Sequence, residues 1–243
     1  MLELVGVGVT YPSGVAALKK TDLQIHRHQV TALIGPSGAG KSTLLRTLNL
    51  LVNPTTGRVK FGGATKHNDP ASIRRHRRSC AMIFQQHQLI GRRTALQNVL
   101  TGRLGHHSSL RTLMPLGTRD RRMALSCLER VGLLDKALSR CDQLSGGQQQ
   151  RVGIARALVQ EPTVILADEP VASLDPAAAN QVLRQLLTIS RQDGTPIVIS
   201  LHQLDYARQF ADRIIGLSNG MIVFDDAPEH LDETLVKQIY QTN

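Results

Sequence analysis

The segment Gly35-Pro-Ser-Gly-Ala-Gly-Lys-Ser42 constrains the fold more than any other part of the sequence. It follows the apolar run 30–34 and continues into the helical pattern 41–49, so it lies between a predicted strand and a predicted helix. A phosphate-binding loop requires this context. A glycine-rich turn with an incidental lysine is the alternative, and eight residues in pattern and in context argue against it.

This loop offers several contacts to a nucleoside triphosphate. Three glycines can adopt positive φ and leave no side chain between the backbone N–H groups and a phosphate. The N-terminus of the following helix adds unpaired N–H groups and partial positive charge. Lys41 can reach the β- and γ-phosphates, and the Ser42 hydroxyl can bind Mg²⁺. The candidate nucleotide-binding residues of this segment are Gly35, Pro36, Ser37, Gly38, Ala39, Gly40, Lys41, Ser42 and Thr43.

The composition fits one large α/β domain with an inserted subdomain. The chain has 243 residues, of which 41% are hydrophobic. It starts without a basic, apolar leader and contains no apolar stretch near the ~20 residues of a membrane helix. We therefore expect a cytosolic protein unless a partner carries it to a membrane. The odd number of cysteines and the absence of Cys-x-x-Cys spacing predict reduced thiols, without disulfides or zinc.

The net charge of +10 is the unusual feature of the composition. Clusters such as Arg74–Arg78 could indicate a nucleic acid or an anionic lipid surface as partner. Aromatic residues make up only 3% of the chain and Trp is absent, which leaves little with which to stack bases. We therefore favour a solvated basic face without specific nucleic-acid binding. An anionic membrane leaflet remains compatible with it.

Periodicity gives the order of elements. Alternating residues predict antiparallel strands at 2–10 and 22–26 before the phosphate loop, and further strands are expected at 58–62 and 79–84. From Gln86 to about Gln160 the spacing becomes helical, with helices expected at 95–100 and 120–131. The later elements are strands at 163–167, 196–201, 213–217 and 221–224, a helix at 177–193, and a hairpin turn at Asn219-Gly220.

These elements predict an α/β fold in a single domain, 1–243. The β/α alternation implies a mostly parallel, buried sheet. Residues 1–85 and 161–243 are expected to form the nucleotide-binding core with an antiparallel β subdomain. Residues 86–160 are expected to form an inserted helical subdomain.

Two carboxylates follow the predicted strand 163–167. Asp168 and Glu169 lie at its C-terminal end, where ligands bind in open α/β sheets. Asp168 complements Ser42 as a Mg²⁺ partner, and Glu169 is placed to polarise an attacking water. The alternative is a pair of solvated acids at a turn, which the intact phosphate loop disfavours.

The segment Leu144-Ser-Gly-Gly-Gln148 opens a helix predicted at 149–159. A serine and two glycines at a helix N-terminus form a second potential anion site of the same physical kind. By itself the segment would be an ordinary helix cap, with the serine as N-cap.

With these motifs the chain resembles the ATP-binding subunits of ABC transporters over essentially its full length. The resemblance implies a P-loop NTPase core of the RecA-like type, with ATP and Mg²⁺ as cofactors. The matching segments, in order, are Tyr11, the Walker A loop 35–42, Gln85, the signature 144–148, the Walker B pair 168–169, Ser173-Leu-Asp175 and His202.

The resemblance also implies roles for these residues. Two subunits would pair head to tail as a homodimer, so that the signature of one binds the γ-phosphate held by Lys41 of the other. Tyr11 would stack on adenine, Gln85 would join the nucleotide site to the helical subdomain, and Asp175 would support communication across the dimer. The implied catalytic residues are Glu169, His202 and Gln85, the signature ligands are Ser145, Gly146, Gly147 and Gln148, and the metal ligands are Ser42, Gln85 and Asp168.

Length separates the branches of this superfamily. The stretch between Gln85 and Leu144 is too short for the coiled coils of the DNA-repair members, and translation-associated members carry two such domains. Exporters usually fuse the ATPase to membrane helices, so a separate importer subunit is favoured. The stretch 203–243 is too short for the regulatory domain of sugar and methionine importers.

Among short importer subunits, segments 98–105, 141–151 and 167–176 resemble the phosphonate type, with a polar amino acid importer as the alternative. The basic stretch Gly91–Thr94 departs from the family pattern. Expected partners are two transmembrane permease subunits and a periplasmic or extracellular substrate-binding protein, with the ATPase peripheral on the cytoplasmic face of the inner membrane. A nucleic-acid-linked ATPase is favoured only by the charge, and intact Glu169 argues against a regulatory module without turnover.

Overall fold

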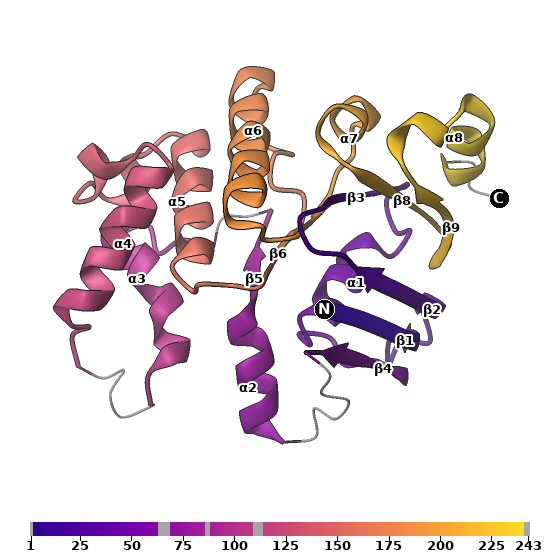
Figure 1. The fold of residues 1–243 in the computed structure, drawn as a ribbon, viewed down its shortest axis with the longest axis horizontal. Coiled ribbons are helices and arrows are strands. Elements are labelled where there is room, and N and C mark those ends of the chain that lie inside the picture. The colour runs from indigo at the N-terminus through magenta and orange to yellow at the C-terminus, as the bar shows by residue number, and fades with distance from the viewer. Residues whose placement is uncertain (1, 63–68, 86–87, 109–113, 241–243) are drawn as a thin grey trace.

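The computed structural model describes residues 2–62, 69–85, 88–108 and 114–240 (Figure 1). The strands are β1 (Leu2–Thr10), β2 (Ala16–Ile25), β3 (Val30–Ile34), β4 (Thr56–Phe61), β5 (Cys80–Ile83), β6 (Val164–Ala167), β7 (Ile197–Ser200), β8 (Arg213–Ser218) and β9 (Met221–Asp226). The α-helices are α1 (Lys41–Leu48), α2 (Pro70–Ser79), α3 (Ala95–Leu100), α4 (Thr118–Arg130), α5 (Gly146–Leu158), α6 (Pro176–Asp193), α7 (Leu204–Phe210) and α8 (Glu233–Tyr240). Short 3-10 helices are η1 (Thr101–His106), η3 (Leu134–Lys136), η4 (Cys141–Gln143) and η5 (Pro228–His230).

The core is a six-stranded sheet in the order β5-β6-β7-β3-β8-β9. Its first five strands are parallel, and β9 returns antiparallel to β8. Asn219 and Gly220, between β8 and β9, have φ of 48° and 73°, as a tight hairpin of the primed type requires. The prediction of a mostly parallel α/β core is confirmed.

A second sheet is antiparallel and three-stranded, in the order β2-β1-β4. Strand β2 is longer than predicted because its first half pairs with the end of β1, where Val9 faces Leu18 and Thr10 faces Ala16. Register shifts interrupt this pairing after Leu4 and again before Thr10. Such irregularities break the strict alternation of side chains, so the sequence pattern shows only the regular half of β2.

Helices α3, α4 and α5 lie between β5 and β6 in the chain and form the left-hand part of Figure 1. They are the inserted helical subdomain of the predicted fold class, while its exact bounds, 86–160, stay a prediction. Helices α2, α7 and α8 were not predicted. Helix α2 carries the Arg74–Arg78 cluster, and its Asp69 N-cap followed by Pro70 is a start signal that its high charge obscured.

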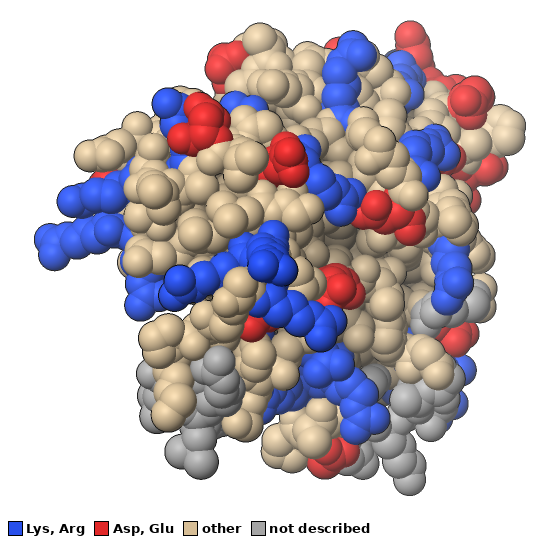
Figure 2. All heavy atoms as spheres, turned by 60° about the vertical axis from the view of Figure 1, so that its left-hand side comes forward, with Lys and Arg blue, Asp and Glu red and all other residues tan. Residues whose placement is uncertain are grey.

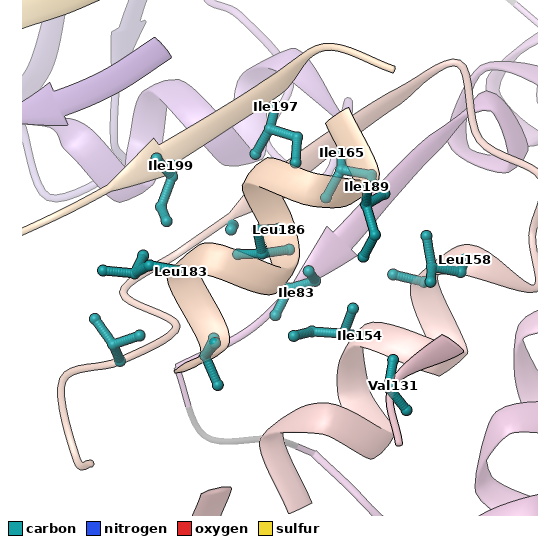
Figure 3. Packing of buried hydrophobic residues seen from close by; sticks show 14 of the residues in the cluster. Ile83, Val131, Ile154, Leu158, Ile165, Leu183, Leu186, Ile189, Ile197 and Ile199 are labelled. Carbon is teal, nitrogen blue, oxygen red and sulfur yellow. The ribbon is translucent and has the colours of Figure 1, made fainter. Parts of the chain in front are cut away.

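The core sheet separates two apolar clusters. Side chains alternate along each strand, so Ile165 and Ile197 point to one face while Leu166 and Val198 point to the other. Figure 3 shows the first face, where Leu183, Leu186 and Ile189 of α6 cover the strands beside Ile154 and Leu158 of α5. Burying each such side chain contributes about 1.5–3 kcal/mol. The sheet and the helical subdomain therefore share one continuous core.

The cysteines and the helices bear on two expectations from composition. Cys80, Cys127 and Cys141 are free thiols with buried side chains. Among the residues that the structure describes, no helix combines the length and apolar character needed to cross a membrane.

Candidate active site

The loop between β3 and α1 has the backbone that the sequence predicts. Gly35, Gly38 and Gly40 have φ of 143°, 82° and 104°. A Cβ on Gly35 would lie 2.2 Å from the carbonyl oxygen of Leu217, and one on Gly40 would lie 2.5 Å from that of Ala17. Both positions thus require glycine for conformation and for space.

Helix α1 begins at Lys41 without a side-chain cap. Its first N–H groups are therefore available to an anion in the loop. Lys41 is 4% exposed, and its Nζ donates to the carbonyl oxygens of Gly35 at 2.7 Å and Pro36 at 3.0 Å. Burial lowers the pKa of Lys41, and the carboxylates of Glu169 and Asp168 partly offset this effect.

Asp168 lies against the phosphate loop. Its Oδ1 accepts hydrogen bonds from Ser42 Oγ at 2.8 Å and from Ser200 Oγ at 3.1 Å. Its Oδ2 lies 3.6 Å from Nη2 of Arg46. Its backbone N–H donates to the carbonyl oxygen of Ile83 on β5, which fixes the residue at the end of the sheet. The structure therefore brings two of the three predicted metal ligands, Ser42 and Asp168, together.

Glu169 stands next to His202. Nε2 of His202 lies 2.6 Å from Oε1 of Glu169, whose side chain is 15% exposed. Glu169 has φ of 49°, a left-handed conformation that is uncommon for residues other than glycine. Its backbone N–H donates to Ser200 Oγ at 2.8 Å. The ends of β6 and β7 thus bring two of the three predicted catalytic side chains, Glu169 and His202, together.

The oxygens of Ser42 and Asp168 suit a magnesium ion. Mg²⁺ binds hard oxygen ligands and in nucleotide sites usually takes one or two carboxylates together with substrate phosphates. Within the described parts of the chain, no group of three or more His, Cys, Asp or Glu side chains forms a metal cluster. The hydroxyl and carboxylate, 2.8 Å apart beside the phosphate loop, fit this ion.

Tyr11 and Gln85 have different surroundings. The hydroxyl of Tyr11 is 3.1 Å from Thr43 Oγ1, so its ring stands beside the start of α1. Gln85 follows β5 and is exposed. Among the described residues, the structure records no hydrogen bond from Gln85 to Ser42 or Asp168. The adenine-stacking role of Tyr11 and the metal role of Gln85 therefore stay predictions.

The signature forms the N-terminus of α5. This helix begins at Gly146, earlier than the predicted start at Gln149, because Ser145 and Gln148 form a capping box: Ser145 Oγ accepts from Gln148 N at 3.3 Å, and Gln148 Oε1 accepts from Ser145 N at 2.9 Å. Both glycines of the signature lie in the first turn. Asp175 caps α6 in a similar way, since its Oδ1 accepts from Ala177 N and Ala178 N.

Within one chain the signature is remote from the phosphate loop. Figure 1 shows α5 with α3 and α4 on one side of the core sheet, while α1 lies toward the opposite side beside β1 and β2. The structure therefore does not bring Ser145 to Lys41 of the same chain. If the signature binds a phosphate, that phosphate is not one held by the phosphate loop of the same chain.

The segment after Gln85 is tied to the segment before the signature. Backbone N–H groups of Cys141 and Asp142 donate to the carbonyl oxygens of Arg93 and Gly91, each at 3.0 Å. Asn98, which is 1% exposed, donates to Cys141 Sγ at 3.1 Å and bonds both backbone groups of the Ile90 peptide. Hydrogen bonds therefore connect segment 90–98 with residues 141–142, which lie just before the signature.

The main residue that sequence reasoning missed is Ser200. It is fully buried at the end of β7 and contacts both carboxylate residues through one hydroxyl. The available signal was a serine at the end of an otherwise apolar strand, because a buried hydroxyl requires a partner. Asn98, a buried amide on an amphipathic helix, carried a similar signal.

Comparisons with known proteins agree with this geometry. The model of the ABC transporter family matches residues 18–172. The phosphite import ATP-binding protein PxtA of Stutzerimonas stutzeri is 57% identical, over 99% of this chain and 87% of that protein. The phosphonates import ATP-binding protein PhnC 3 of Nostoc sp. is 54% identical, over 99% of this chain and 92% of that protein.

Solved structures give the same result for the fold. A dimeric ATP-binding cassette in a post-hydrolysis state, bound to ADP and Pi, has a TM-score of 0.81 and 34% identity, covering 95% of this chain and all of that one. A nucleotide-free cassette of an ABC transporter has a TM-score of 0.86 and 27% identity, covering 100% and 99%.

Proposed function

The chain belongs to the ABC transporter family, and from this we propose that it is the ATP-hydrolysing subunit of an importer for phosphonates. The observation that carries the hydrolytic part is that Asp168 contacts Ser42, Glu169 contacts His202, and both carboxylates raise the pKa of the buried Lys41 ammonium against the effect of burial. The substrate class is supported by the identity of 54% to a phosphonate import protein and 57% to a phosphite import protein.

Each residue of the site has a proposed part in hydrolysis. The loop glycines and the start of α1 bind the phosphates through backbone N–H groups, and Lys41 neutralises their charge. Glu169 accepts a proton from the attacking water, and His202 orients that carboxylate while its own exposed edge faces the γ-phosphate. Ser42 and Asp168 would hold Mg²⁺, which supplies charge neutralisation of the phosphate oxygens.

The signature supports a head-to-tail homodimer. Its anion site lies far from the phosphate loop of the same chain, so a second subunit is needed to bring Ser145, Gly146, Gly147 and Gln148 to a nucleotide. The similarity to a dimeric cassette with ADP and Pi supports the same arrangement. In this dimer ATP is bound between two subunits, and closure would complete the site.

A basic groove supports docking on membrane partners. Arg74, Arg77 and Arg78 of α2 line a hollow of about 500 Å³ beside η1. Among the described residues none of these three arginines has a carboxylate within ion-pair distance. Figure 2 shows Lys and Arg side chains forming a band across this side of the molecule. We infer that two permease subunits cover this face, with the ATPase peripheral on the cytoplasmic side of the inner membrane and a separate protein delivering the substrate.

Uptake measurements test the proposal. Source cells carrying Glu169→Gln should lose uptake of a labelled alkylphosphonate and keep uptake of a polar amino acid. Cells carrying Glu229→Gln provide the matched control, because Glu229 is an exposed glutamate on η5, an element that contributes no residue to the site. Loss of amino acid uptake alone would assign the subunit to the amino acid branch. Adding unlabelled phosphite to the phosphonate uptake assay shows whether the importer also accepts phosphite, because phosphite would then compete with the labelled phosphonate.

A further inference from the structure

A single buried hydroxyl links the two carboxylate residues of the site. Ser200 is the last residue of β7 and is 0% exposed. Its Oγ is 3.1 Å from Asp168 Oδ1 and 2.8 Å from the backbone N of Glu169. β7 lies between β6, which is followed by Asp168 and Glu169, and β3, which leads into the phosphate loop. Ser200 therefore ends the strand that separates the two strands leading into these motifs.

The direction of both hydrogen bonds is fixed by chemistry. The N–H of Glu169 can only donate, so Ser200 Oγ is the acceptor of that bond. The one proton of the hydroxyl is then free to point at the carboxylate of Asp168. The hydroxyl thus uses its proton and one of its two lone pairs, and its 0% exposure leaves no solvent to replace either partner.

The backbone conformation of Glu169 makes its hydrogen bond to Ser200 important. Its φ of 49° is a conformation that costs free energy in a residue with a side chain. The bond to Ser200 holds the peptide in this conformation, which directs the Glu169 side chain toward His202. The other bond holds the Oδ1 that Asp168 also presents to Ser42.

We propose that Ser200 is a positioning residue of the ATPase: one hydroxyl sets the direction of the Glu169 carboxylate and the rotamer of Asp168 together. This inference rests on the proposed hydrolytic function of the site. It assigns no contact with ATP to Ser200 itself. Removal of the hydroxyl should therefore act on turnover and on the metal, and much less on binding of the nucleotide.

The test compares Ser200→Thr with Ser200→Val in the purified full chain. Both replacements are β-branched and similar in volume, so they impose the same packing change on β7, and only threonine keeps the hydroxyl. We expect kcat for MgATP to fall about 10- to 100-fold more in the valine variant, because a small displacement of a reacting group costs about that factor. The KM for ATP should differ by less than about 3-fold between the two variants.

A second readout does not depend on turnover. Binding of Mn²⁺, followed by electron paramagnetic resonance with a non-hydrolysable ATP analogue, should weaken in Ser200→Val and recover in Ser200→Thr. In a Glu169→Gln background, Ser200→Val should lower the residual hydrolysis less than in the native background, because one of the two groups through which Ser200 acts has been removed.

Equal kcat and equal Mn²⁺ affinity of the threonine and valine variants would overturn the inference, whether both are active or both inactive. Thermal melting and ATP binding in EDTA establish that both variants are folded with an intact phosphate loop. The native protein serves as the reference for the proposed function: absence of MgATP hydrolysis there would count against the function, whereas a null result confined to Ser200 would leave it standing.

Discussion

The imidazole Nε2 of His202 lies 2.6 Å from Oε1 of Glu169, although the two residues follow different strands of the core sheet, β7 and β6. The carboxylate is mostly buried, at 15% exposed, while His202 remains 44% exposed on its other side. One histidine can therefore contact the proposed general base and still face a phosphate bound in the loop.

Replacing Glu169 with glutamine should slow hydrolysis by about 10²- to 10⁴-fold while ATP binding is preserved, because an amide cannot accept the proton from water. ATP should then trap a dimer, which sedimentation can detect. Glu229→Gln is the control, because it makes the same glutamate-to-glutamine exchange outside the site. Unchanged turnover in Glu169→Gln would remove the role of general base from this residue.

Replacing Ser145 with arginine should abolish ATP-driven dimerisation and leave the ATP affinity of the monomer nearly unchanged, because a bulky cation would fill the second anion site. Ser145→Ala separates this effect from the loss of the cap, which costs about 1 kcal/mol of helix stability. Equilibrium dialysis measures the affinity, and sedimentation measures the dimer. A full ATP-induced dimer of the arginine variant would show that the signature does not close the site.

Tyr11 offers a test of adenine stacking. Phenylalanine keeps the ring and removes the hydroxyl that lies 3.1 Å from Thr43 Oγ1, whereas alanine removes both. If the ring stacks on the base, Tyr11→Ala should weaken ATP binding by about 1–3 kcal/mol, and Tyr11→Phe should stay close to native. Fluorescence titration with a labelled ATP analogue measures this. Equal weakening in both variants would assign the role to the hydroxyl.

A buried ion pair in the helical subdomain should be costly to break. Arg103 Nε is 3.0 Å from Asp120 Oδ1, and both side chains are less than a tenth exposed. Burial acts to raise the pKa of Asp120, but hydrogen bonds from Arg103 and His107 outweigh it and lower the pKa.

Replacing Asp120 with alanine should therefore cost about 3–5 kcal/mol, because Arg103 keeps a buried charge that has lost its buried partner. Glu161 bonds the same guanidinium from a side chain that is 60% exposed, so Glu161→Ala should cost at most about 1 kcal/mol. Urea denaturation measures both free energies of unfolding. Similar costs for the two variants would contradict the dependence on burial.

Alkaline pH should destabilise the protein through Cys80. Burial raises the pKa of this thiol to about 12 from its ordinary value of 9.0. Above pH 9 the unfolded chain loses the thiol proton and the folded chain keeps it, so the free energy of unfolding falls as the pH rises. Between pH 8 and pH 10 this group should account for about 1.4 kcal/mol of the loss.

The difference in stability between pH 8 and pH 10 should thus be smaller by that amount in Cys80→Ala. Urea denaturation at both pH values gives the two differences. The alanine variant can be less stable at either pH without affecting the comparison. An unchanged difference would mean that the thiol ionises in the folded chain as it does in the unfolded one.

The phosphate loop and the Asp168-Glu169 pair could be predicted because several independent signals coincide there. Glycine spacing, strand and helix periodicity and the charged residues all agree between Val30 and Ser42. No such agreement of signals marks Ser200, because its proposed role depends on its contacts with Asp168 and Glu169, which follow a different strand. Contacts between neighbouring strands are set by sheet order, which a single sequence does not contain.

Helix boundaries were predicted where apolar periodicity was strong, as in α3, and missed where it was weak. Helix α2 buries only His76 and is otherwise mostly charged and polar, so no stripe of apolar residues announces it. The early start of α5 had a different cause: the capping box of Ser145 and Gln148 outweighs the low helix propensity of two glycines.

The position of the helical subdomain between two adjacent strands has a consequence for the order of folding. β5 and β6 are parallel neighbours, yet the whole stretch from 84 to 163 separates them in the chain. Bringing the ends of a long disordered loop together costs entropy that rises with its length. Compaction of α3, α4 and α5 shortens this loop before the strands meet. Pairing of β5 with β6 should therefore be a late, slow event, and the nucleotide site, whose Asp168 is bonded to β5 through Ile83, should be completed only after it.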